Sequence, residues 1–451
     1  MYVTFGHPSK VSGILTVFGR RALVHLGALA SLLPGICWAQ VSAAGSVPPS
    51  HYQGTSAVLK LGLLAAMALA ERQAPELREP EAERDSVQAF RAAGDRWLHR
   101  PPRATLTLGP RRIAGGAQLG WDATVGVFQE FSLGGYGRHL EAYAQAVEHR
   151  ANSNFTAIQR DAKVRAGLFW IDARAAREIL SIRMDALNGA RETLRVAESR
   201  ATVGKSSPAE AALARALLGS VEASVLSAKG DITVADAQLR HVCGIRLHEP
   251  IDVDGPIYKE AQPIDESHVR DLVVAEAPEL IALRSHAQVL ERSATLGKAT
   301  GKPHIELGPS VTHEGTGDWI VLGNMSLPLP GVDPYAADNA HRTMEANLAK
   351  ARSVVAEQAA LRDVEIALHE REHALTVRES LQKGTVEPSQ AAVREYQLQY
   401  EIGRIDLTTL LAARRELLSA QERWAMAAAD VLRAEVKLLR WINETHLKGL
   451  F

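Results

Sequence analysis

Ala74-Pro75-Glu76-Leu77 occurs a second time as Ala277-Pro278-Glu279-Leu280, about 200 residues further along this chain of 451 residues. Shorter matches follow in the same order and at a similar distance: Leu108-Gly109-Pro110 with Leu307-Gly308-Pro309, Trp121 with Trp319, Leu133-Gly134-Gly135 with Leu329-Pro330-Gly331, and Val203-Gly204-Lys205 with Ile402-Gly403-Arg404. Matches at one fixed spacing indicate an internal repeat. The sequence therefore predicts two copies of one unit, each with a helix, two strands and two long helices.

Each copy contains a long segment rich in Ala, Leu, Glu and Arg, which favour helices. Residues 136–203 include no proline, and residues 332–402 include two, of which Pro388 lies in the interior. About 70 residues at 1.5 Å per residue form a rod on the order of 100 Å, far longer than a helix of a compact domain. We expect a kink at Pro388 and helical hairpins that reverse at Gly204 and Gly403, because glycine accepts the left-handed conformation that ends a helix.

The segments before these rods have the period of a β-strand. In residues 121–133 one face is mostly apolar and the other mostly polar, and residues 319–329 alternate in the same phase. The segments 103–110 and 303–311 supply partner strands. Strands of about ten residues with one apolar face, and with Trp121 and Trp319 at the membrane interface, are typical of a transmembrane β-barrel. A pair of half-buried hairpins in a soluble protein is the alternative.

Closure of such a sheet requires more than one chain. Four strands cannot form a barrel, and an open edge in lipid leaves backbone groups unpaired at a cost of several kcal/mol each. Bacterial barrels begin at about eight strands. Two chains supply eight strands and three supply twelve, so we expect an oligomer with a shared barrel.

Composition excludes some classes of protein. The chain has 51 basic and 52 acidic residues and a pI near 7.0, so no basic surface indicates nucleic-acid binding. Its two cysteines, Cys37 and Cys243, predict neither a disulfide framework nor a metal site. Residues 1–39 have the form of a secretory signal, with basic Arg20 and Arg21, an apolar run and Cys37-Trp38-Ala39 as the cleavage site. Export follows. The apolar run 59–70 is too short to span a bilayer, and we expect neither a transmembrane helix in the mature chain nor an acyl anchor.

His369-Glu370-Arg371-Glu372-His373 has the spacing of a zinc-protease motif, in which two histidines on one helix face hold the metal and the glutamate is the base. Both middle positions are charged, and no third histidine follows at the metzincin spacing. We therefore expect no catalytic residue, no cofactor and no metal centre. The zinc protease remains an alternative, as does surface metal binding by His369 and His373.

Several ordered motifs carry a resemblance to a known family. They are the run that ends at Ala74-Pro75-Glu76-Leu77, the strand-to-helix junctions at 129–135 and 325–331, the segment 226–244, and the second tip with the helix that leaves it, 387–415. Over roughly residues 56–445 the chain resembles the TolC-like outer membrane efflux protein family, and within it the heavy-metal-efflux branch typified by CzcC.

This resemblance implies a homotrimer in the outer membrane, whose twelve strands form one barrel that a helical tunnel continues through the periplasm. It also implies two protein partners, a periplasmic adaptor and an inner-membrane pump. Carried over to this chain, the adaptor would dock at the helical tips, which are Val203, Gly204, Lys205, Ile402, Gly403 and Arg404. These residues also have a purely structural interpretation, as turns. Asp406 is a candidate for the periplasmic aperture or, alternatively, a helix cap, with Ser207 at the matching position.

The predicted fold is thus mixed α and β, mostly α. We expect a signal peptide over 1–39, N-terminal helices over 40–102, a first membrane hairpin over 103–134, a helical hairpin over 135–246, a linker and opening helix over 247–302, a second membrane hairpin over 303–331, a second helical hairpin over 332–446 and a tail over 447–451. The predicted function is a passive, non-enzymatic exit duct for small molecules, either heavy-metal cations or drugs. A periplasmic coiled-coil adaptor or scaffold is the main alternative.

Overall fold

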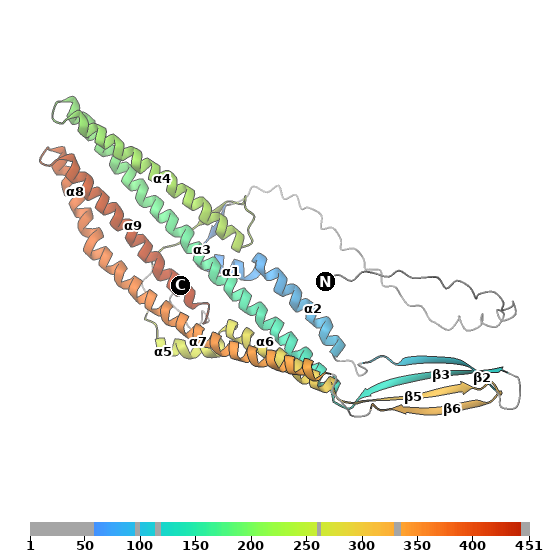
Figure 1. Cartoon of the computed structure of the whole chain (residues 1–451). Coiled ribbons are helices and arrows are strands. Elements are labelled where there is room, and N and C mark those ends of the chain that lie inside the picture. Colours follow the sequence, from blue (N-terminus) through green and yellow to red (C-terminus); the bar gives the residue numbers. More distant parts are fainter. Residues whose placement is uncertain (1–57, 95–99, 113–118, 259–262, 329–334, 443–451) are drawn as a thin grey trace, which may run out of the picture. The chain divides into compact units, whose positions relative to one another are not determined.

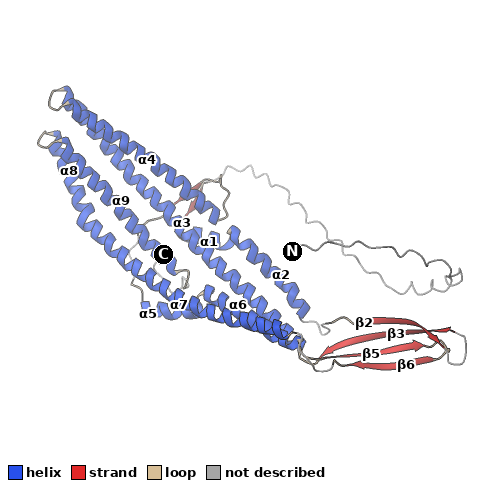
Figure 2. Cartoon of the chain, viewed as in Figure 1, coloured by secondary structure: helices blue, strands red, loops and turns tan. Residues whose placement is uncertain are grey.

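The computed structural model describes residues 58–94, 100–112, 119–258, 263–328 and 335–442. The predicted signal peptide, the tail and the junction at 329–331 lie outside these ranges. Figure 2 shows that the described chain is mostly helical, with one larger β-sheet. This confirms the predicted balance of helix and strand.

The first half of the chain forms β1 (Leu59–Leu61), α1 (Leu63–Gln73), the 3₁₀ turn η1 (Pro75–Leu77), α2 (Arg78–Gly94), β2 (Arg103–Arg112), β3 (Leu119–Ser132), α3 (Tyr136–Thr202) and α4 (Pro208–Val242). The second half forms β4 (Ile251–Val253), α5 (Glu266–Glu276), α6 (Pro278–Thr300), β5 (His304–His313), β6 (Trp319–Ser326), α7 (Ala336–Leu381), the π-helical turn η2 (Gln382–Val386), α8 (Glu387–Glu401) and α9 (Leu407–Leu438).

The larger sheet combines strands from both halves. Its order is β2-β3-β5-β6, and each neighbouring pair is antiparallel (Figure 1). The central pair, β3 with β5, joins residues almost 190 positions apart, for example Val125 with Val311. One further bond fastens the base of the sheet, because the backbone N–H of Leu133 donates to the carbonyl oxygen of Pro303. The two predicted hairpins therefore form a single sheet.

The long helices carry the chain away from this sheet to the tips. Helix α3 has 67 residues, which corresponds to about 100 Å at 1.5 Å per residue. Its counterpart is α7, which continues through η2 into α8. Pro388 lies in the first turn of α8, directly after the π-helical turn, where the N–H of Glu387 bonds to the carbonyl oxygen of Gln382. The predicted kink is thus a π-helical bulge, whose wider turn accommodates a proline that cannot donate to the helix ladder.

Small residues allow the helices to pack closely. The core that joins α1, α3, α6, α7 and α9 contains many alanines, among them Ala166, Ala173 and Ala428. At Gly167 of α3 a Cβ atom would lie only 2.9 Å from Cγ1 of Val436 in α9. The largest buried side chain, Trp170, donates from its indole nitrogen to the carbonyl oxygen of Leu61 at 2.7 Å. This bond fixes β1 against α3.

Two features were not predicted from the sequence. Strands β1 and β4 form a parallel two-stranded ladder, with Leu59 opposite Ile251. In addition, residues 247–302 hold two helices, α5 and α6, where one opening helix was expected. A strand of three residues is too short to show a period, and the helix break at Ala277-Pro278 falls inside a motif that was assigned to one helix.

One helix bears on the expectation that the mature chain has no transmembrane helix. Among the described residues, α4 (Pro208–Val242) is long and apolar enough to do so by length and composition. The same helix packs along α3, and its Asp236 accepts two hydrogen bonds from the guanidinium of Arg177, at 2.8 and 3.0 Å. A charged pair of this kind is costly in lipid. The contacts therefore favour α4 as half of a helical hairpin.

A buried ion pair joins α7 to α9. Nε of Arg371 lies 2.9 Å from a carboxylate oxygen of Glu435, and the two side chains are only 9% and 4% exposed. A buried pair contributes little net stability, but removal of one partner leaves an uncompensated charge.

We therefore predict that Arg371→Ala destabilises the protein by about 3–5 kcal/mol, since it strands the Glu435 carboxylate. The double variant Arg371→Met with Glu435→Leu should be close to wild type or more stable, because no charge remains buried. Thermal unfolding of the detergent-solubilised protein, followed by circular dichroism, measures both. Equal destabilisation by the single and the double change would contradict this interpretation.

Candidate functional site

One face of the sheet carries a continuous set of exposed apolar side chains. The register aligns Leu106, Val125, Val311 and Val321 in one row across all four strands. Their exposed fractions are 66%, 55%, 37% and 74%. The neighbouring row is Leu108, Ala123, His313 and Trp319. A water-soluble protein rarely leaves so large an apolar surface uncovered, so this face requires an apolar environment.

The opposite face is held together by polar side chains. The hydroxyls of Thr124 and Thr312 share a hydrogen bond of 2.9 Å. The Asn324 amide donates to the Ser310 hydroxyl at 2.8 Å. In β6 the alternation is weaker, because Ile320 and Leu322 also lie on this face. The sheet as a whole is amphipathic, as the sequence period predicts.

The charges on the sheet lie in two groups with an uncharged band between them. At the end near the helices, Arg100 pairs with Glu130 at 2.8 Å, and Arg103 pairs with Glu306. At the far end Arg111 lies 2.7 Å from Glu314 and 3.6 Å from Asp122.

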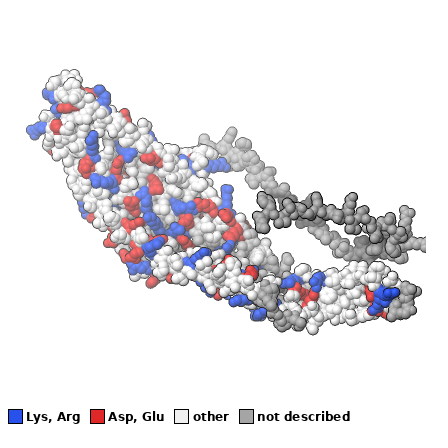
Figure 3. Space-filling model, in the orientation of Figure 1, with Lys and Arg blue, Asp and Glu red and all other residues white. Residues whose placement is uncertain are grey.

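Residues 104–110, 123–129, 307–313 and 319–325 contain no Asp, Glu, Lys or Arg, and Figure 3 shows the white band that they form. Seven residues extend about 24 Å along a strand. That length matches the apolar band of about 25 Å in outer-membrane barrels.

Both predicted girdle tryptophans lie at the far end of this band. Trp121 in β3 is 66% exposed and Trp319 in β6 is 70% exposed. The ring of Trp319 stacks on His313, with the ring centroids 4.6 Å apart. An exposed indole at the end of the sheet that holds Arg111, Asp122 and Glu314 fits an interface between lipid and water; the girdle role itself remains a prediction.

The two helical tips have the same local geometry. Gly204 has φ 68° and Gly403 has φ 80°, so both occupy the left-handed region. After each glycine the next N–H bonds back into the preceding helix, from Lys205 to Arg200 and from Arg404 to Gln399, at 2.8 Å each. Glycine is required here to terminate α3 and α8. The flanking apolar residues, Val203 and Ile402, are 64% and 66% exposed, so each tip presents an apolar and a cationic side chain.

The predicted aperture residue Asp406 caps helix α9. Its carboxylate accepts a hydrogen bond from the N–H of Thr409 at 3.1 Å and from the hydroxyls of Thr408 and Thr409. The Thr408 hydroxyl, followed by the groups of Thr409, lowers the pKa of Asp406 to about 2. At the matching position Ser207 caps α4 and accepts from the N–H of Glu210. Asp406 is therefore a helix cap, and it remains exposed and charged at neutral pH.

Sequence reasoning missed the contacts that join the two tips. The guanidinium of Arg200 donates to the backbone oxygen of Tyr400 and lies over its ring, 4.6 Å from the centroid. The Tyr400 hydroxyl contacts the carboxylate of Glu210 at 3.5 Å. These residues link the ends of α3 and α8 with the start of α4. No motif indicates such a contact, since the partners are about 200 residues apart.

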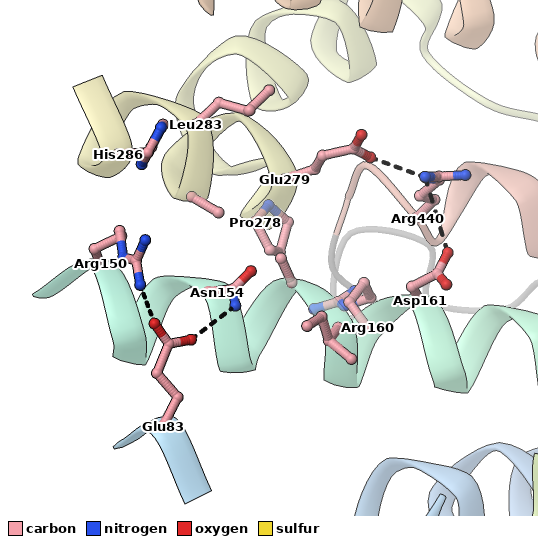
Figure 4. Close-up of a pocket in the computed structure, with 13 residues that line it drawn as sticks. Glu83, Arg150, Asn154, Arg160, Asp161, Pro278, Glu279, Leu283, His286 and Arg440 are labelled. Carbon is pink, nitrogen blue, oxygen red and sulfur yellow. Dashed lines mark hydrogen bonds and ion pairs between the residues drawn. The ribbon is translucent and has the colours of Figure 1, made fainter. Parts of the chain in front are cut away.

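A cavity of about 440 Å³ lies between α2, α3, α6 and Arg440 (Figure 4). Its charged groups are paired within the chain: Arg150 and Asn154 donate to Glu83, and Arg440 bridges Glu279 and Asp161. Burial raises the pKa of Asp161 and lowers that of His286. The network joins the two halves of the chain and leaves little unpaired charge for a ligand.

The described residues contain no group of three or more His, Cys, Asp or Glu side chains arranged to hold a metal ion. His369 and His373 lie on the exposed side of α7.

Amphipathic strands with an uncharged band, joined to long helical hairpins, are also the fold of solved outer membrane channels. Residues 274–444 match the model of the outer membrane efflux protein family. No curated protein matches the chain.

Solved structures share the fold. The outer-membrane channel OprN is 20% identical, with a TM-score of 0.64 over 84% of this chain and 89% of its own. CusC, described in a study of transmembrane channel formation, is 15% identical, with a TM-score of 0.66 over 89% of this chain and 96% of its own. The open state of the Neisseria gonorrhoeae MtrE outer membrane channel is 19% identical, with a TM-score of 0.66 over 89% of this chain and 95% of its own. At these identities the matches establish the fold.

We predict opposite effects for one chemical change at two glycines. Gly204→Ala should destabilise the first tip by about 1–2 kcal/mol, because an L-residue is strained in the left-handed region. Gly219→Ala, in the exposed interior of α4, should stabilise by about 1 kcal/mol through helix propensity. A Cβ atom meets nothing within 4 Å at either site, so no steric clash confuses the comparison. Amide hydrogen exchange of the tip and of α4 reports the two effects, and the same sign at both sites would refute the backbone argument.

Proposed function

We propose that this protein is the outer membrane channel of a tripartite efflux system, a passive and non-enzymatic exit duct for small molecules. In this proposal the β2-β3-β5-β6 sheet spans the outer membrane, and the helical hairpins extend into the periplasm. The two halves of the chain are then copies of one unit, as the repeated motifs indicate.

The observation that carries the proposal is the amphipathic sheet with its two edges. In the described part of the chain, β2 and β6 each pair on one side only. The backbone groups at the outer edges of β2 and β6 need hydrogen-bonding partners. At the same time, the apolar row from Leu106 to Val321 needs an apolar solvent. A bilayer covers the apolar face, but it offers no hydrogen bonds to the edges. Further copies of the chain would satisfy the edges, and three copies make a twelve-stranded barrel.

The polar face would then line the lumen, with Thr124, Thr312, Ser310 and Asn324 in contact with water. A water-filled path of this kind needs no catalytic residue. The helical tips, Val203-Gly204-Lys205 and Ile402-Gly403-Arg404, would receive a periplasmic adaptor protein, and an inner-membrane pump would supply the energy. Trp121 and Trp319 would form part of the interfacial girdle, and residues 1–39 would act as the export signal.

Two classes of substrate are compatible with such a duct. Heavy-metal cations follow from the sequence resemblance to the CzcC-type branch, whereas drugs fit the same duct. A periplasmic adaptor or scaffold is disfavoured, because such a protein has no lipid to cover the apolar face of the sheet.

We predict that the protein fractionates with the outer membrane and that, extracted in detergent, it migrates without heating as a species of about three times the monomer mass. Boiling should convert this species to the monomer, because heat separates the strands that close the barrel. Recovery as a soluble periplasmic monomer would refute the duct and favour the scaffold.

We predict that Asp406→Asn lowers the preference of the reconstituted channel for cations, because three carboxylates near the mouth attract cations. The reversal potential in a planar bilayer under a salt gradient measures this preference. Asn keeps an oxygen for the cap, so the helix start is retained; Ser207→Ala is the matched control, which changes the other cap without a change of charge.

The pH dependence follows from the same carboxylate. The folded-state pKa of Asp406 is about 2, below its ordinary value of 3.8. Its charge, and the stabilisation that comes from its depressed pKa, are thus present above about pH 4 and are lost as the pH falls toward 2. The wild-type cation preference that depends on Asp406 should therefore persist from pH 7 to pH 5. An unchanged reversal potential in Asp406→Asn would exclude the aperture role.

A further inference from the structure

One side of α7 presents two imidazoles that the proposed duct does not use. His369 and His373 are one helical turn apart and exposed. Their ring centroids are 6.4 Å apart, and the ring planes differ by 15°. Among the described residues neither imidazole has a hydrogen-bonding or ionic partner. The two ring nitrogens of each histidine are therefore available to bind a ligand.

The side of the same helix that contacts α9 is fixed by burial and by charge. Arg371 pairs with Glu435 inside the protein, and Glu370 pairs with Lys437 at 2.7 Å. Ala367 and Ala374 are buried on either side of Arg371. These contacts to α9 set the rotation of α7 about its axis. The two histidines consequently stay on the exposed side of α7 and cannot turn into the core.

This arrangement does not support hydrolysis. Glu370, the residue that would act as base in a zinc protease, lines a cavity of about 330 Å³ together with Lys437 and Arg440, and neither histidine lines that cavity. Because Glu370 is held by Lys437, in a cavity that neither histidine lines, it is not placed to activate a water on a metal at the histidines. The motif therefore offers metal ligands without a catalytic site.

We propose that His369 and His373 form a two-imidazole site for a borderline divalent transition metal, of the class of Cu²⁺, Ni²⁺ and Zn²⁺. Imidazole nitrogen is a preferred ligand of these ions. Metal–nitrogen bonds of about 2.0–2.1 Å place two imidazoles on one ion with their centroids roughly 5 Å apart. Small rotations of two exposed side chains close the difference from the present spacing. Water completes the coordination.

The site has two physical consequences. Cu²⁺ should bind most tightly, since affinity for nitrogen ligands rises along the divalent series to copper. The metal should also stabilise this turn of α7, because the two ligands are correctly spaced only when the helix is formed.

The test is a Cu²⁺ titration of the purified, detergent-solubilised full chain, produced without a histidine tag and followed by electron paramagnetic resonance. The wild type should bind one Cu²⁺ per chain at this site, with hyperfine coupling from two imidazole nitrogens. His369→Gln and His373→Gln should each weaken that site at least tenfold and remove the two-nitrogen signature.

A matched control is His149→Gln in α3. His149 is also exposed, but Gln145 and Ser153 lie one turn away on either side, so α3 places no second imidazole at the i, i+4 spacing. This change should leave the two-nitrogen signal intact. A rescue variant combines His369→Gln with Val377→His, which recreates the i, i+4 pair one turn further along and should restore the signal.

Unchanged two-nitrogen binding in both single variants would overturn the proposal, as would its absence in the wild type. Failure of the rescue variant, with its helix content retained, would also count against a site defined by helical spacing. The membrane location and oligomeric state are measured separately, so this result does not depend on whether the protein is a duct.

Discussion

The hydrogen-bonding requirement of an amphipathic sheet dominates this structure. Four strands expose a row of apolar side chains, from Leu106 to Val321, and end in two strands that pair on one side only. Water is an unfavourable environment for the apolar face of the sheet, and lipid is unfavourable for the unpaired backbone groups at its edges. In the proposed oligomer, closure of the sheet with other copies of the chain satisfies both requirements. The proposed oligomer, the membrane location and the lumen all derive from this conflict.

Long helices connect the sheet to the two tips. Helix α3 runs without interruption from the sheet to the first tip, while the path through α7 and α8 contains one π-helical turn before Pro388. Close packing depends on small side chains such as Ala166 and Gly167, and on buried pairs such as Arg371 with Glu435. The tips are in turn tied together by Arg200 and Tyr400. Sheet and tips are therefore parts of one continuous framework.

Charge is distributed to suit these roles. The sheet keeps its Arg and Asp or Glu residues in two groups beyond an uncharged band, whereas the helices carry many ion pairs. In the cavity of Figure 4, charged groups from both halves neutralise one another around Asp161 and Arg440. Such internal pairing suits a structural joint. The two histidines on α7 differ from this cavity, because their ring nitrogens are not paired within the described part of the chain.

The sequence by itself determined the repeating pattern, the type of each main element and the glycines at the two tips. These are local properties: period two marks the strand from Trp121 onward, helix propensity marks α3, and the left-handed turns require Gly204 and Gly403. Asp406 was also recognisable as a cap, because a cap acts within one turn.

Only the tertiary structure decided which strands are neighbours, which charges are buried and how the tips meet. The pairing of β3 with β5, the Arg371–Glu435 bridge and the contact of Arg200 with Tyr400 join residues that are far apart in the chain. The parallel β1–β4 ladder is likewise a long-range contact between three-residue segments. Such contacts depend on how complete elements pack in space, and no local period or propensity encodes that packing.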